Sequence, residues 1–146
     1  MSIRTNIRTT AQLACALVFL GTILRAQSLI SDIKAERDPA KRSEKALSIA
    51  DECFSSAHQF YDKGQINKGD AELENMMTAL KECVVSLDTV HKAKYYKKAE
   101  MNVADLQRRL SGLLDDLSLQ ERGWAEYTSR KLDEVHDKIL DGVMRK

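Results

Sequence analysis

The segment from Tyr96 to Leu117 restricts the choice of fold more than any other part of this 146-residue chain. Its apolar residues recur at alternating spacings of three and four, which is the period of a helix with a buried seam. The seam positions are Tyr96, Ala99, Val103, Leu106, Leu110, Leu113 and Leu117. Charged and polar residues fill the other positions, so this helix needs neighbours to cover one face. We therefore expect it to belong to an antiparallel helical bundle.

A helical hairpin is predicted before this segment. Asp38 can cap a helix that starts at Pro39, and Gly64 is suited to end it. Asn67 is placed to cap a second helix, and the loop is so short that the two helices must be antiparallel. The expected buried positions are Leu47, Ala50, Phe54, Ala57 and Tyr61 in the first helix, and Gly69, Leu73, Met76, Leu80, Cys83, Leu87 and Val90 in the second.

Two more helices are predicted, one at each end of this region. Residues 28–37 contain enough apolar surface for a short helix that docks on the bundle, although its length makes it marginal alone. Ser118 and Glu121 have the spacing of a capping box, which predicts a last helix that ends near Met144. Its seam is expected at Ala125, Thr128, Leu132, Val135 and Ile139.

Between Val90 and Tyr96 the apolar rhythm loses phase. Either the chain turns there, or one long helix changes the face that it buries; we expect a turn. A single proline and an aromatic content of 5% agree with an all-α protein. The fold that we expect is a small antiparallel bundle of about four helices, formed by residues 27–146 as a single domain.

The predicted hairpin resembles a known repeat family. Ala57, Tyr61, Gly64, Ile66, Gly69, Leu73 and Met76 follow the order of small, aromatic and turn residues in a tetratricopeptide helical hairpin. The resemblance covers residues 50–80 and does not recur in register, as a stacked array would require. It implies a scaffold that binds other proteins, with a tetratricopeptide-like hairpin followed by a C-terminal helical pair.

The first 26 residues have the order of a secretory signal peptide. Arg4 and Arg8 precede an apolar run at 11–24, and small residues follow near Ala26. The run is shorter than the roughly 20 residues that span a bilayer as a helix. We expect cleavage after Ala26 and a periplasmic or secreted protein, although Leu24 is larger than such sites prefer. The alternative is an uncleaved membrane anchor.

Export affects how charge and cysteine content are interpreted. Removal of residues 1–26 takes away three arginines and no acid, so the net charge changes from +1 to −2, which argues against a nucleic-acid binder.

In an exported protein, Cys53 and Cys83 would meet oxidising conditions. If the hairpin turns near Gly64, their axial offset is roughly 9 Å, beyond the roughly 7 Å that a disulfide tolerates between Cα atoms. We expect two buried thiols, with a disulfide as the alternative.

One basic cluster is the strongest candidate for a binding surface. We call Lys92, Lys94, Tyr95, Lys97 and Lys98 the Lys92–Lys98 patch. Lysines interleaved with aromatic rings can hold phosphates, an acidic polymer or lipid headgroups. The simpler interpretation is a row of solvated lysines beside a buried Tyr96, and the nearly neutral net charge favours it.

No pattern in the sequence predicts a reaction centre. His58 with Asp62, and His136 with Asp133, each offer two ligands on one helix face, which is half of a metal site. Phosphate-binding glycine loops, nucleophile elbows and dinucleotide motifs are missing from the sequence. We therefore expect no cofactor and no metal, and a non-enzymatic exported monomer or weak dimer that acts through contact with another protein. The alternative is an envelope-associated protein that binds an anionic surface through the Lys92–Lys98 patch.

Overall fold

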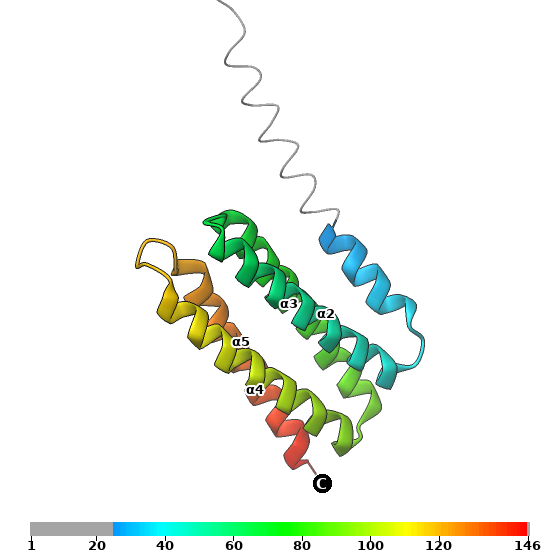
Figure 1. Cartoon of the computed structure of the whole chain (residues 1–146). Coiled ribbons are helices and arrows are strands. Elements are labelled where there is room, and N and C mark those ends of the chain that lie inside the picture. Colours follow the sequence, from blue (N-terminus) through cyan, green and yellow to red (C-terminus); the bar gives the residue numbers. More distant parts are fainter. Residues whose placement is uncertain (1–24, 146) are drawn as a thin grey trace, which may run out of the picture.

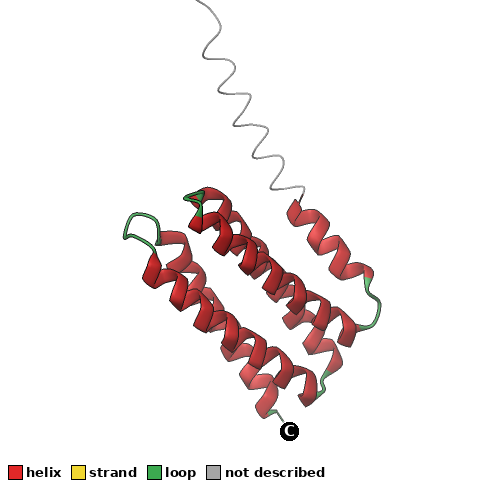
Figure 2. Ribbon diagram, viewed as in Figure 1, coloured by secondary structure: helices red, strands yellow, loops and turns green. Residues whose placement is uncertain are grey.

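The computed structural model describes residues 25–145, which form helices joined by short loops (Figure 2). No strand occurs among these residues, so the all-α prediction is confirmed. The long helices are α2 (Pro39–Asp62), α3 (Ile66–Val90), α4 (Ala93–Asp116) and α5 (Gly123–Met144). A shorter helix at 25–35 precedes them, where a short helix was predicted at 28–37, so the described range holds five helices, whereas a bundle of about four was expected. The predicted leader at 1–26 lies almost entirely outside the described residues.

The turn between α2 and α3 explains one error at a helix start. Gly64 adopts the left-handed conformation with φ of 70°. The amide of Gln65 donates to the carbonyl of Phe60 at 2.8 Å, which is the hydrogen bond of a Schellman motif. Because this motif completes the reversal so early, α3 already begins at Ile66 with Gln65 as its N-cap. Asn67 is therefore inside the first turn, and its predicted capping role is wrong.

The other two junctions differ in how well the sequence predicted them. The turn after Val90 is confirmed, because His91 takes a left-handed conformation with φ of 50° and ends α3 without a glycine. Ser118 and Glu121 do interact, with 2.6 Å between the Ser118 hydroxyl and a carboxylate oxygen of Glu121. Their pairing closes a loop turn, however, and α5 begins later, at Gly123. The prediction that this pair starts the helix is wrong.

The helices are arranged as two antiparallel hairpins packed side by side (Figure 1). α2 contacts α3 and α4 contacts α5 within the hairpins, while α2 contacts α4 and α3 contacts α5 between them. α3 and α4 follow one another in the chain but lie diagonally across the bundle. α2 and α4 are consequently parallel neighbours in one layer, and α3 and α5 form the other layer. The predicted seams face this core; Val90 and Leu117, at two helix ends, are only partly buried.

Two tyrosines of the core pack against glycines of neighbouring helices. The Tyr61 ring covers Gly69, where a Cβ atom would come within 2.8 Å of the ring. The Tyr96 ring covers Gly142 of α5 even more closely, because a Cβ atom there would meet it at 2.1 Å. The hydroxyl of Tyr96 donates to Asp88 at 2.8 Å, which fixes the ring in place. These contacts bring α2 close to α3, and α4 close to α5.

The helix at 25–35 lies on the α2–α3 hairpin, away from α4 and α5 (Figure 1). Ile33 is fully buried there, and Leu29 is packed against the core. Lys45 of α2 donates to the carbonyl of Asp32 at 2.8 Å, which places a cation near the C-terminal end of the short helix. None of the helices in the described range is long and apolar enough to cross a membrane.

Candidate functional site

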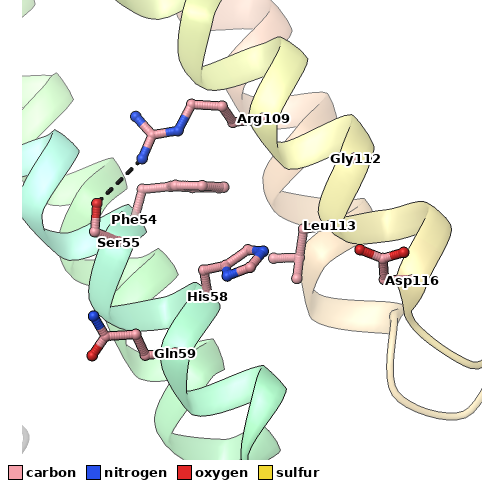
Figure 3. Close-up of a pocket in the computed structure, with 8 residues that line it drawn as sticks. All are labelled: Phe54, Ser55, His58, Gln59, Arg109, Gly112, Leu113 and Asp116. Carbon is pink, nitrogen blue, oxygen red and sulfur yellow. Dashed lines mark hydrogen bonds between the residues drawn. The ribbon is translucent and has the colours of Figure 1, made fainter.

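A cleft of about 510 Å³ lies between the parallel helices α2 and α4 (Figure 3). Its lining residues are Phe54, Ser55, His58 and Gln59 from α2, and Arg109, Gly112, Leu113 and Asp116 from α4. Phe54 and Leu113 are each 2% exposed and form an apolar floor. The polar side chains stand at the rim, so the cleft combines an apolar base with a few hydrogen-bonding groups, as ligand and peptide sites do.

Arg109 shapes one wall of this cleft. Its guanidinium carbon lies 4.6 Å from the centre of the Phe54 ring, and its Nη2 atom donates to the Ser55 hydroxyl at 3.2 Å. The same guanidinium forms ion pairs with Asp51 of α2 and Asp105 of α4. The side chain therefore bridges the two hairpins, and a planar cation rests on an aromatic face. Its position is defined before any partner binds.

His58 faces the same cleft from α2. Its Nδ1 atom lies 3.2 Å from a carboxylate oxygen of Asp62, so the predicted local pair forms. The prediction of a His58–Asp62 pair did not include the residues of α4 that form the opposite rim of the cleft. Residues 54–59 and 109–116 carry no local signal that they face each other, because seam spacing does not say which helices become neighbours.

The Lys92–Lys98 patch surrounds the start of α4. Lys92, Lys94 and Lys97 are exposed, and Lys94 lies 4.7 Å from the centre of the Tyr95 ring. Lys98 is tied to α2 through an ion pair of 2.7 Å with Glu44. The patch therefore consists of three exposed lysines, a half-buried tyrosine and one lysine that joins the hairpins.

The remaining histidines are separate from one another. His91 is the C-cap of α3, and His136 Nε2 lies 3.1 Å from Glu100 of α4. The proposed neighbour of His136, Asp133, instead accepts a hydrogen bond from Gln107 at 2.7 Å. Among residues 25–145, no three histidine, cysteine or acidic side chains come together as a metal site would require.

Both cysteines of the described range, Cys53 and Cys83, are buried and unbridged, so the expectation of two free thiols is confirmed. Burial raises the pKa of each to about 12. For Cys53 the neighbouring carboxylate of Glu72 contributes further in the same direction. These thiols are protonated at neutral pH and are poor nucleophiles.

Glu72 is a buried acid that sequence reasoning missed. It is only 4% exposed, and its Oε1 atom lies 2.7 Å from Arg25 in the short helix. Its Oε2 atom has no hydrogen-bond partner among the described residues. An acid next to the seam residue Leu73 looks like an ordinary flanking position. Its contact with Arg25 of the short helix could not be inferred from spacing alone.

Comparison with known proteins identifies no relative from which a role could be transferred. The chain matches no family model, no curated protein and no solved structure.

Proposed function

We propose that this is an exported helical protein that acts by binding another protein, with the cleft between α2 and α4 as the contact site. The observation that carries the proposal is the shape and chemistry of that cleft: an apolar floor, a polar rim and a volume of about 510 Å³. The order of charged, apolar and small residues in the first 26 positions supports export. The tetratricopeptide-like pattern of the first hairpin supports a scaffold role.

The cleft favours a partner that inserts an apolar side chain between its two helices. That side chain would lie above the buried residues Phe54 and Leu113, and Arg109 and Gln59 at the rim would contact polar groups of the same segment. Because Arg109 is held by ion pairs and by the Phe54 ring, little side-chain entropy is lost when it meets a partner. The proposed interaction is therefore one of contact, without a chemical step.

Gly112 offers a direct test, because a Cβ atom at this position would meet nothing within 4 Å. A large side chain can therefore obstruct the cleft without entering the core. Gly112→Arg should abolish capture of the partner from the native envelope, while Gly112→Ala should preserve it. Equal capture by both variants, with unchanged circular dichroism, would refute the cleft as the contact site.

Site-specific crosslinking locates the contact independently. A photoreactive residue at Gln59, on the rim, should crosslink to the partner, while one at exposed Lys81 of α3 should not. Cell fractionation tests export separately from binding. Recovery of the protein solely in the cytosol would refute export, whatever the crosslinking result.

A second candidate function is binding of an anionic surface through the Lys92–Lys98 patch. The observation in its favour is that Lys92, the N-cap of α4, supplies no side-chain hydrogen bond to the first turn. A helix N-terminus beside exposed lysines attracts anions. Replacement of Lys92, Lys94 and Lys97 by glutamate should abolish salt-sensitive binding to anionic vesicles. Unchanged binding would eliminate the patch.

The Lys92–Lys98 patch is distant from the start of the described chain. The described chain starts beside Glu72 in the first half of α3, whereas the patch follows the end of α3 at Val90. These points are about 27 Å apart along the helix axis at 1.5 Å per residue. The start of the short helix and the start of α4 therefore lie toward opposite ends of the bundle (Figure 1).

A further inference from the structure

The ion pair between Arg25 and Glu72 joins the predicted leader to the folded part of the chain. Nη1 of Arg25 lies 2.7 Å from Oε1 of Glu72, whose side chain is 5% exposed. A buried carboxylate is costly unless a cation or hydrogen bonds compensate it. The thiol of Cys53 lies beside the same carboxylate, and Oε2 has no hydrogen-bond partner in the described residues, so Arg25 is the cation that compensates its charge.

Arg25 also lies in one row with two core-facing residues of the short helix, although its own side chain is 52% exposed. Arg25, Leu29 and Ile33 are spaced four residues apart, which places them in one row on a helix. Ile33 is fully buried and Leu29 is partly buried against the core. The row is therefore apolar where it covers apolar residues and cationic where it reaches the buried acid.

Cleavage after Ala26 would remove this compensation. The remaining helix would keep Leu29 and Ile33, but the Glu72 carboxylate would lose its cation. Leu24 also makes cleavage after Ala26 unfavourable, because signal-peptide cleavage sites prefer a small residue at the position that Leu24 occupies.

We propose that Arg25 is a structural residue of the folded domain and that processing of the leader spares it. The domain then begins at or before Arg25, instead of at Gln27. The statement about processing rests on the proposed export, whereas the statement about the ion pair does not.

The N-terminus of the protein recovered from the envelope tests the processing step. Intact mass and N-terminal sequencing should find a chain that starts at or before Arg25, with or without the rest of the leader. A chain that starts at Gln27 or later would overturn the proposal. It would leave export intact, because export and the cleavage position are separate outcomes.

A mutant cycle on the purified full chain tests the ion pair. Arg25→Gln should lower the urea midpoint roughly three times as much as Lys34→Gln, since Lys34 pairs with the more exposed Glu82 at 3.6 Å. The loss should shrink in a Glu72→Gln background, and Arg25→Lys should restore part of the midpoint.

Equal losses for Arg25→Gln and Lys34→Gln, with no coupling to Glu72, would overturn the structural role. If fractionation finds the protein only in the cytosol, the proposed export fails, and the mutant cycle alone then decides the role of Arg25.

Discussion

Replacement of Gly142 by alanine is the sharpest test of how α4 and α5 pack. Gly142 lies in α5 under the ring of Tyr96, and an added Cβ would meet ring atoms at 2.1 and 2.2 Å. Such distances are well inside van der Waals contact, so either the ring or the helix must move. The ring cannot swing freely, because its hydroxyl donates to Asp88 at 2.8 Å and the residue is 4% exposed.

Two opposing effects set the size of the change. Alanine in a helix interior is more favourable than glycine by about 0.5–1 kcal/mol. Forcing an extra carbon into a packed core costs about 1–3 kcal/mol. The steric cost is larger at Gly142, so we expect a net loss of about 1–2 kcal/mol in the free energy of unfolding. This corresponds to a fall in Tm of roughly 3–10 °C for a domain of this size.

Gly112→Ala is the matched control. It makes the same substitution in α4, at a position where a Cβ would meet nothing within 4 Å. Only the helix propensity of alanine over glycine acts at that position, so we expect the free energy of unfolding to rise by about 0.5–1 kcal/mol. Urea unfolding of the full chain, followed by circular dichroism, measures both variants in the same assay.

The reasoning fails if the Gly142 variant is as stable as the Gly112 variant. A further check uses Tyr96→Phe, which removes the hydrogen bond to Asp88 and lets the ring shift. The cost of Gly142→Ala should be smaller in that background. An undiminished cost would mean that the ring is not held by its hydroxyl.

Three further predictions concern other contacts of the bundle. Burial raises the pKa of Cys53 and Cys83 from 9.0 to about 12, so their contribution to stability is complete below pH 9 and is lost as pH rises toward 12. The urea midpoint should therefore fall between pH 8 and pH 11. The fall should be steeper than in the variant in which both cysteines are replaced by alanine. Tyr61→Phe removes the hydroxyl that donates to Asp70, which should cost about 1–2 kcal/mol in urea unfolding, while an unchanged midpoint would contradict this role. Arg109→Ala removes a bridge between the hairpins and should cost about 1 kcal/mol, with faster limited proteolysis, whereas wild-type resistance would argue against the bridge.

The sequence by itself determined the helices and the face that each one buries. All the seam residues of α4 are buried except Leu117 at its end, which is half-buried. The turn after Val90 was also predicted, from a loss of phase alone. These features are local, because helical periodicity places apolar side chains on one face whatever that face later contacts.

Helix ends were predicted less well, for an equally local reason. Asn67 and the pair Ser118 and Glu121 have the right residue types for caps, yet neither starts its helix. Several starting points within one turn can satisfy the free amides. The tight turn at Gly64 and the loop turn at Ser118 decide where the following helices begin, and residue type alone does not predict these positions.

Only the tertiary structure decided which helices are neighbours. The diagonal relation of α3 and α4 brings Arg109 onto Phe54 and creates the cleft. The short helix brings Arg25 to the carboxylate of Glu72, which no local pattern marks as buried. An apolar seam must be covered, but the seam of any helix that fits can cover it. Which helices pair therefore depends on loop lengths and on the fit of side chains across the whole bundle.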